Sequence, residues 1–321
     1  MKLSVHLLTL TSALVVAAPA SAQNYPVRPV RVVVPFAAGG NTDITARAIG
    51  AKLSEVFGQQ IVVENRPGGA TNIGTELVAK APADGYTMLM GGATNAINMS
   101  TQAKPPYDTL RDFAPVILCV KGANVLSLHP SVPARNLKEL IALARARPGQ
   151  LNFASSGLGS SNQMAGELFK VMANINIVHV PYKGNAPAIT DTVGGHIEMM
   201  FSGVPAVVPH IQSGRLRAIA IGSLKRFTAI PEVPTFDESG VKGYEATTWF
   251  GLMAPVRTPK DIVARWNSEV GKILASPDLR GRFINDGLEP MGGTQGEFER
   301  FIRIEIEKYA KVVKAVGLKP Q

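Results

Sequence analysis

Two turns rich in glycine and serine carry the residue types best suited to binding an anion. The first spans residues 37–43, reads AAGGNTD, and lies between an apolar run and a predicted helix. Its glycines let the backbone turn sharply and bring bare N–H groups up to a ligand. The start of the following helix adds unpaired N–H donors and partial positive charge, which favour a carboxylate.

The second turn, residues 155–161, has the same construction and reads SSGLGSS, so that it adds hydroxyl donors. It also follows a predicted strand and opens a predicted helix, and open α/β sheets bind ligands at the carboxyl ends of their strands. Each turn alone is also consistent with an ordinary strand-to-helix connection. The presence of both favours a two-sided clamp for a carboxylate.

Three further positions are candidates for the same cleft. Asp43 stands near a helix start, where it either caps the helix or reaches a ligand through water. Thr94 and Asn95 follow Gly91-Gly92 at the end of a predicted strand and are expected at the cleft edge.

Two more sites are ambiguous from the sequence. Tyr182 and Lys183 end another predicted strand, where they either face the cleft or belong to a solvated loop. Trp249 and Phe250 either line the cleft or pack in the core, and the core is the favoured interpretation.

Signatures of catalysis are largely missing. The chain has no G-x-G-x-x-G, P-loop or G-x-S-x-G motif, and its histidines do not fall at metal-binding spacings. His179 lies in an apolar run and is interpreted as a structural histidine. The alternative from another class is an exported hydrolase using Ser156 or Ser160, but no general base is evident from spacing. We therefore predict a non-enzyme without cofactor or metal.

The elements around these sites alternate. The first part of the chain predicts strands and helices at 30–36, 42–57, 61–63, 72–80 and 86–90. The middle repeats the alternation at 137–147, 151–154, 162–172, 175–180, 186–193, 197–201, 204–212 and 216–221. This order predicts two doubly wound α/β units, each with its own sheet.

The last part of the chain differs, since one predicted strand at 247–254 precedes three helices at 259–275, 278–286 and 295–315. These helices either cap the second unit or return to the first. In the second case the chain crosses between lobes near 120–125 and 243–248, and these crossings form a hinge. Patterning alone leaves both arrangements open.

The N-terminus reads as an export signal. Lys2 and His6 precede an apolar stretch at 7–18, and Ala20-Ser21-Ala22 provides the small residues of a cleavage site. The stretch is shorter than the roughly 20 residues that span a bilayer. We expect residues 1–22 to be removed near Ala22.

The composition limits the classes of partner. The formal net charge of +9, or +8 without the leader, attracts anionic ligands. The basic residues are scattered and are not interleaved with aromatic residues, which argues against nucleic-acid binding. Cys119 is the only cysteine, so no intrachain disulfide can form.

Several segments resemble one known family, the Bug receptors of tripartite tricarboxylate transporters. The resemblance rests on PFAAGGNTD at 35–43, VENRPG at 63–68, DGYT at 84–87, ASSG at 154–157, AGELF at 165–169, VPYKG at 180–184, PEVPT at 231–235 and WFGL at 249–252. These segments extend over nearly the whole chain after the leader.

The resemblance implies a two-lobed periplasmic-binding-protein fold, similar to type II, with a hinge of two crossings. Residues 23–123 and 246–321 would form lobe 1, and residues 124–245 would form lobe 2. The resemblance further implies a monomeric periplasmic receptor that captures a small organic carboxylate and delivers it to membrane permease subunits. A ligand sensor for a signalling protein is a further alternative.

In the family the ligand is held by the two turns and by bridging water. The predicted ligand-binding set is therefore Phe36, Ala37, Ala38, Gly39, Gly40, Thr42, Asp43, Thr94, Asn95, Ser155, Ser156, Gly157, Ser160, Gln163 and Tyr182. Many relatives carry histidine at the position of Gln163. Because glutamine stays neutral, any contact from Gln163 to the ligand is a neutral hydrogen bond, and the ligand of a relative does not transfer directly.

Overall fold

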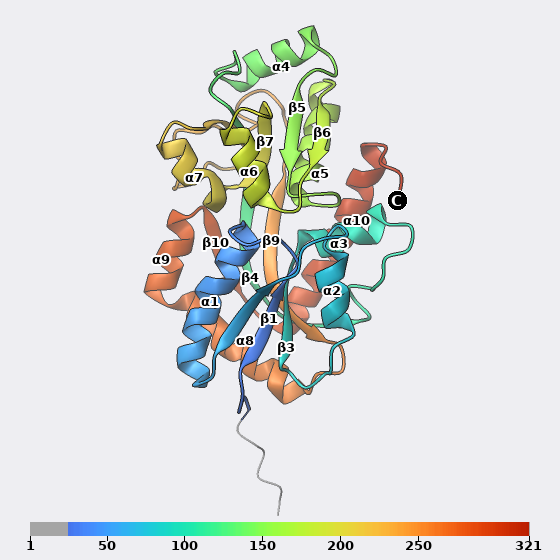
Figure 1. Ribbon diagram of the computed structural model, residues 1–321, viewed down its shortest axis with the longest axis vertical. Coiled ribbons are helices and arrows are strands. Elements are labelled where there is room, and N and C mark those ends of the chain that lie inside the picture. Colours follow the sequence, from blue (N-terminus) through green and yellow to red (C-terminus); the bar gives the residue numbers. More distant parts are fainter. Residues whose placement is uncertain (1–24, 321) are drawn as a thin grey trace, which may run out of the picture.

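The computed structural model describes residues 25–320, so the predicted export signal lies outside the described residues. The chain forms two stacked α/β lobes (Figure 1). The elements in chain order are β1 Val30–Val34, α1 Asn41–Phe57, β2 Ile61–Asn65, α2 Asn72–Ala79, β3 Thr87–Gly92, α3 Ala93–Thr101, β4 Phe113–Leu128, α4 Leu137–Ala146, β5 Asn152–Ser155, α5 Ser161–Ala173, β6 Val178–Pro181, α6 Asn185–Val193, β7 Met199–Gly203, α7 Val204–Gln212, β8 Arg217–Ile221, β9 Thr247–Pro255, α8 Lys260–Ala275, α9 Pro277–Asn285, β10 Leu288–Gly292 and α10 Gln295–Ala315.

One long strand, β4, joins the sheets of the two lobes. Its first part pairs antiparallel with β9 and β10, and its last part pairs antiparallel with β7 and β8. The resulting strand order is β2-β1-β3-β9-β4-β7-β5-β6, with β10 and β8 also on β4. Each lobe thus has its own set of paired strands, and the two sets share β4, a single 16-residue strand.

The predicted α/β alternation is confirmed, and the structure adds α3, β4 and β10 to the predicted elements. Helix α3 follows β3 directly, and β10 lies between the last two helices. Both are short, and α3 is rich in Thr, Asn and Ser, which have modest helix propensity. Tertiary packing of α3 against α10 and of β10 against β4 accounts for their formation.

Helices cover both faces of each sheet, which fits the doubly wound pattern. In lobe 1, the lower one in Figure 1, one core cluster lies under α1, α8 and α9, and another lies under α2, α3 and α10. In lobe 2, the upper one, one cluster packs under α4 and α5 and the other under α6 and α7. The last three helices thus pack on the first sheet.

The chain crosses between lobes at a backbone junction of Asn124, Gly222 and Ala246. The Asn124 N–H donates to the Ala246 carbonyl at 3.0 Å, Gly222 donates to Asn124 at 2.7 Å, and Ala246 donates to Gly222 at 2.7 Å. A side chain at Gly222 would lie 2.8 Å from the Ala246 carbonyl oxygen, so the close approach of these backbones requires glycine there.

Candidate functional site

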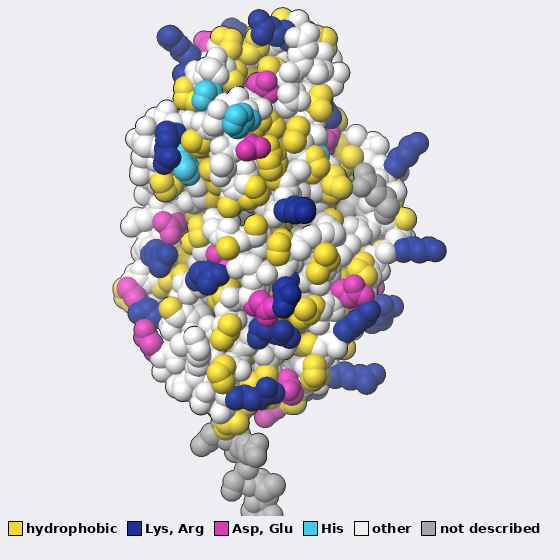
Figure 2. Space-filling view, in the orientation of Figure 1, with side chains coloured by type: hydrophobic (Ala, Val, Ile, Leu, Met, Phe, Trp, Pro, Cys, Tyr) yellow, Lys and Arg dark blue, Asp and Glu magenta, His cyan; other side chains and the backbone are white. Residues whose placement is uncertain are grey.

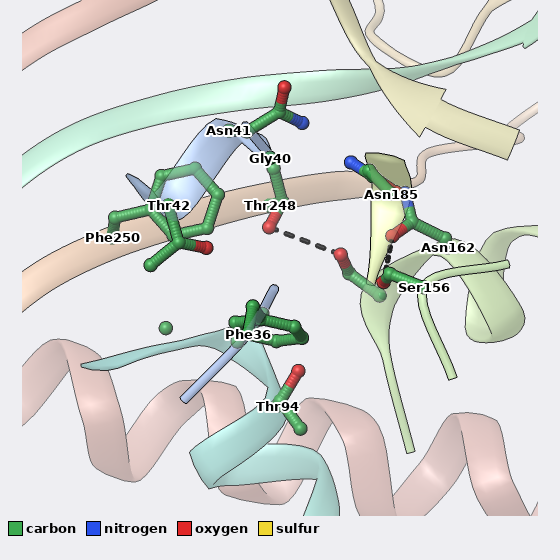
Figure 3. Close-up of a pocket in the computed structure, with 13 residues that line it drawn as sticks. Phe36, Gly40, Asn41, Thr42, Thr94, Ser156, Asn162, Asn185, Thr248 and Phe250 are labelled. Carbon is green, nitrogen blue, oxygen red and sulfur yellow. Dashed lines mark hydrogen bonds between the residues drawn. The ribbon is translucent and has the colours of Figure 1, made fainter. Parts of the chain in front are cut away.

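A narrow cavity lies between the lobes beside this junction. Lobe 1 contributes residues from the turn after β1, from the end of β3 and from β9, and lobe 2 contributes residues from the turn after β5 and from the start of α6 (Figure 3). The lining residues are Phe36, Gly40, Asn41, Thr42, Gly92, Ala93, Thr94, Ser156, Ser161, Asn162, Asn185, Thr248 and Phe250. None of these side chains is ionisable.

Four helices begin at this cavity. Gly40 and Gly92 are the N-caps of α1 and α3 in lobe 1, and Ser160 and Gly184 are the N-caps of α5 and α6 in lobe 2. A glycine cap has no side-chain oxygen to accept from the first amides. The cavity therefore combines backbone N–H donors with the positive ends of four helix dipoles, which is an environment for an anion.

A chain of side-chain hydrogen bonds connects the cavity to the inter-lobe junction. The Ser156 hydroxyl donates to Asn162 Oδ1, and Asn162 Nδ2 donates to Asn124 Oδ1 at 2.7 Å. Asn124 Nδ2 then faces the carbonyl oxygens of Ser161 and Ala246, each at 3.3 Å. A ligand that contacts Ser156 is thus three hydrogen bonds away from the crossing between the lobes.

The two lobes also contact each other directly across the cavity. The Ser161 hydroxyl donates to Thr248 Oγ1 at 3.1 Å. On another side, Asn41 Oδ1 accepts from the Ala206 N–H at 3.1 Å. The structure therefore describes a closed arrangement of the lobes.

Five of the predicted ligand-binding residues line the cavity. Lobe 1 supplies four of them and lobe 2 supplies one, as the two-sided clamp requires. They are Phe36, Gly40, Thr42, Thr94 and Ser156.

In the first turn, the other predicted residues lie outside the cavity. Ala38 and Gly39 are exposed, and Ala37 packs beside Gly184 of lobe 2. Asp43 is buried, and its carboxylate accepts hydrogen bonds from the Gly39 N–H, from Arg47 and from Asn65. Asp43 therefore supports the turn from behind.

Burial by itself would raise the pKa of Asp43. Hydrogen bonds from Arg47, from the Gly39 N–H and from Asn65 outweigh that effect and hold the pKa below its usual range. Asp43 is thus ionised at neutral pH, and its carboxylate oxygens already accept hydrogen bonds from these donors.

In the second turn, most of the serine hydroxyls are used to build the turn itself. The Ser155 hydroxyl hydrogen-bonds His179 Nε2 at 2.6 Å, and Ser160 accepts from the Gln163 N–H at 3.2 Å as the cap of α5. Gly157 has φ of +127°, and a side chain there would lie 2.7 Å from the Tyr182 carbonyl oxygen. These positions hold the turn's shape and do not line the cavity.

The remaining predicted residues lie beside the cavity. Asn95 is buried in a polar network, with Oδ1 accepting from the Gly92 N–H at 2.9 Å. Gln163 Oε1 accepts from the Gly159 N–H at 2.7 Å, and Gln163 lines a neighbouring cavity rather than this one. Tyr182 lines a separate pocket that shares Phe36 and Ser156 with the cavity, and its hydroxyl donates to Asp191 at 2.7 Å. Burial, followed by Asp191, raises the pKa of Tyr182 to about 12.

The predicted ligand-binding set omits six polar or aromatic residues that line the cavity. For Trp249 and Phe250, the sequence left the cleft and the core as alternatives and favoured the core. Phe250 lines the cavity, whereas Trp249 is buried and donates from Nε1 to Glu305 at 2.9 Å. Both side chains belong to the core, as the sequence favoured, but alternation along β9 sends them to opposite faces of the sheet, and Phe250 also lines the cavity. The missed residues are Asn41, Ser161, Asn162, Asn185, Thr248 and Phe250.

The geometry gives no support to a serine nucleophile in the second turn. Ser156 is bonded to Asn162, and Ser160 donates to the Gly157 carbonyl at 2.6 Å. Ser155 does meet a histidine, but Ser155 is fully buried. Desolvation, with a contribution from Lys170, lowers the pKa of His179 to about 4, so this histidine is neutral and structural. Within residues 25–320, no group of three or more His, Cys, Asp or Glu is placed to hold a metal ion.

Comparison with known proteins identifies the family. Residues 45–318 match the family described as tripartite tricarboxylate transporter family receptor. The chain belongs to this family. Its relatives include Protein BugT of Bordetella pertussis, 39% identical over 306 residues, which cover 95% of this chain and 94% of BugT.

Solved structures of family members have the same fold. A structure titled R. palustris Rpa4515 with adipate has a TM-score of 0.91 and 39% identity, covering 92% of this chain and all of that one. MatC of Rhodopseudomonas palustris, with bound malate, has a TM-score of 0.86 and 31% identity, covering 90% of this chain and all of that one. The two-lobed periplasmic-binding fold inferred from the resemblance is confirmed.

Proposed function

We propose that this protein is a periplasmic receptor that binds a small aliphatic dicarboxylate between its lobes and presents it to the permease of a tripartite tricarboxylate transporter. The observation that carries the proposal is the convergence of four helix N-termini on a cavity lined only by neutral side chains. A buried carboxylate needs several donors to offset its lost hydration, and these amides and hydroxyls supply them. The adipate and malate held by two family members support the same ligand class.

The ligand would contact lining residues from both lobes. In lobe 1 we assign contacts to Phe36, Gly40, Thr42 and Thr94 of the predicted set, together with Asn41, Thr248 and Phe250. In lobe 2 we assign contacts to Ser156 of the predicted set, together with Ser161, Asn162 and Asn185. The other predicted residues would shape the two turns or pack beside the cavity: Ala37, Ala38, Gly39, Asp43, Asn95, Ser155, Gly157, Ser160, Gln163 and Tyr182.

The lobes would move as two bodies around the junction of Asn124, Gly222 and Ala246. We assign residues 23–123 and 246–321 to lobe 1 and residues 124–245 to lobe 2. An open form admits the ligand, and closure completes its donors from lobe 2. Closure requires only that the ligand binds the closed form more tightly than the open form.

The cellular setting follows from the family and from the leader. We propose that residues 1–22 direct export, that cleavage occurs near Ala22, and that the mature protein acts as a monomer without catalysing a reaction. In the described residues no helix has the length and apolar character needed to span a bilayer. On the face shown in Figure 2, basic and acidic side chains are dispersed among each other, in keeping with a small anion as the ligand rather than a nucleic acid.

A ligand screen with recovery tests this function. We expect aliphatic dicarboxylates of the adipate and malate type to raise the melting temperature, because a ligand that binds only the folded state stabilises it. After overnight incubation, the bound acid should be recovered unchanged in full amount. Conversion of the acid would show an enzyme instead of a receptor, and the absence of any shift with dicarboxylates, aromatic acids and amino acids would contradict a carboxylate receptor.

A further inference from the structure

Asn41 connects the two lobes through a hydrogen bond that belongs to a helix start. It is the first residue of α1 in lobe 1, and its Oδ1 accepts from the N–H of Ala206 at 3.1 Å. Ala206 is the third residue of α7 in lobe 2. Figure 3 shows the Asn41 amide at the edge of the cavity, directed away from Phe36 and Thr94.

Helix α7 has no cap of its own for this amide. Its N-cap is Gly203, which has no side chain, and no side-chain cap hydrogen bond is formed from within lobe 2. Pro205 at the second position lacks an N–H, so the Ala206 N–H is the first-turn donor that Asn41 satisfies. An asparagine oxygen bound to the third amide of a helix is the usual geometry of an N-cap, here supplied from the other lobe.

Lobe 2 also leaves space for this side chain. A Cβ atom built on Gly203 would lie 2.0 Å from Asn41 Nδ2 and 2.9 Å from its Cγ. Gly203 has φ of −68° and ψ of 146°, which any residue adopts, so its backbone conformation does not require glycine. What a side chain at 203 would displace is the amide of Asn41.

We infer that Asn41 is a positioning residue that holds the lobes closed by capping α7 across the cleft. Only the part of the inference that concerns adipate binding rests on the proposed function. Because Asn41 also lines the cavity, ligand contact and lobe closure share one side chain. When the lobes separate, the Ala206 N–H exchanges Asn41 for water, so the cap contributes to the closed form alone.

Hydrogen exchange at the Ala206 amide tests the cap without knowledge of the ligand. In the ligand-free protein, Asn41→Ala should raise the exchange rate of this amide by up to about fivefold, the usual effect of losing a cap (about 1 kcal/mol). The full factor is reached when the ligand-free lobes are mostly closed. Asn41→Asp should keep the amide protected, because a carboxylate oxygen also accepts from it. Exchange in Asn41→Ala that is unchanged both without ligand and at saturating adipate would overturn the inference, and so would loss of protection in Asn41→Asp equal to that in Asn41→Ala.

Adipate binding tests the coupling to closure. We expect adipate to increase Ala206 protection in the wild type. In Asn41→Ala one loss of closure is divided between two measurements, so the factor by which ligand-free Ala206 exchange rises, multiplied by the factor by which adipate affinity falls, should be about five. The matched control is Asn136→Ala, which removes the cap that α4 receives from within lobe 2, where Asn136 Oδ1 accepts from the Glu139 N–H at 2.9 Å. This control should lower the melting temperature but leave adipate affinity unchanged. Equal Ala206 protection with and without adipate would show that the contact persists in the open form. It would overturn the inference that Asn41 holds the lobes closed.

A double-variant cycle distinguishes the cap that Asn41 provides to α7 across the cleft, here called the latch, from a direct contact of Asn41 with the ligand. Gly203→Ala does not alter a cavity-lining residue, yet it should weaken adipate at least as much as Asn41→Ala by displacing the Asn41 amide. In the double variant the clash is absent, so the affinity should return to that of Asn41→Ala alone. Additive losses would contradict the latch. If adipate binds none of the proteins, including the wild type, the ligand proposal fails, while the exchange result at Ala206 still decides the cap.

Discussion

Replacing Thr42 with aspartate is expected to weaken adipate binding by at least about 100-fold while leaving the ligand-free protein folded. Thr42 is the second residue of α1, is buried, and lines the cavity. A carboxylate at this position accepts from the first amides of the helix and complements its dipole, as an incoming anion would. It also places a fixed negative charge beside the ligand, and two like charges about 4 Å apart repel by about 4 kcal/mol in a partly screened site.

The control for this variant is Thr42→Asn, which has nearly the shape of aspartate without its charge. We expect this control to stay within about tenfold of wild-type affinity, as neutral hydrogen bonds contribute about 1 kcal/mol each. The melting temperature of ligand-free Thr42→Asp should equal or exceed that of Thr42→Asn, since an acidic residue in the first turn stabilises a helix. Calorimetry and thermal melting measure both quantities. Equal affinities for the two variants would mean that the ligand does not bind at the start of α1.

A second large effect is expected from the ligand side. Adipate should bind at least about 100-fold more tightly than 2-aminoadipate, which differs by an ammonium group next to one carboxylate. No acidic side chain lines the cavity. Asp43, the one carboxylate in the predicted ligand-binding set, lies outside the cavity and is paired with Arg47 and Asn65. A buried ammonium without a partner costs several kcal/mol, and the positive ends of four helices repel it further.

The matched ligand for this comparison is 2-hydroxyadipate, which adds a group of similar size without charge. Its affinity should lie within about tenfold of that of adipate, because the hydroxyl can use the neutral amides of the cavity. Competition titrations at constant pH give the three constants. Binding of 2-aminoadipate as tight as that of adipate would show that an anionic group reaches the ligand and that the neutral lining is not the basis of selection.

Much of the binding region was predictable because its signals are local. Glycine after a buried strand marks a sharp turn into a helix, and both such turns contribute to the cavity. The capping alternative for Asp43 was also available from its place near a helix start, and the structure shows its carboxylate holding the turn. These features depend on residues within a few positions of each other.

The rest of the site depends on contacts distant in the sequence. Thr248 and Phe250 reach the cavity because β9 pairs with both β3 and β4, a pairing that local patterning does not reveal. The serines of the second turn show a different limit. Their hydroxyls were predicted as ligand donors, yet Ser155 and Ser160 are engaged within the protein. A serine whose hydroxyl builds a turn cannot be distinguished in the sequence from a serine whose hydroxyl faces a ligand.

Asn41 illustrates both limits in one residue. It lies in the predicted turn, but its importance arises from α7, more than 160 positions away, whose start has no cap of its own. Gly203 appears in the sequence as an ordinary end of a strand. Only the closed arrangement of the lobes shows that the missing side chain at 203 accommodates the amide of residue 41.

A crystal structure of the protein with adipate tests the central claim most directly. We predict that adipate lies in the cavity between the turns, with carboxylate oxygens about 3 Å from first-turn amides of α1 and from Ser156, and with no lysine or arginine in contact. Adipate bound elsewhere on the chain, or held in the cleft by an ion pair with a basic side chain, would contradict the claim that neutral donors at converging helix starts form the site.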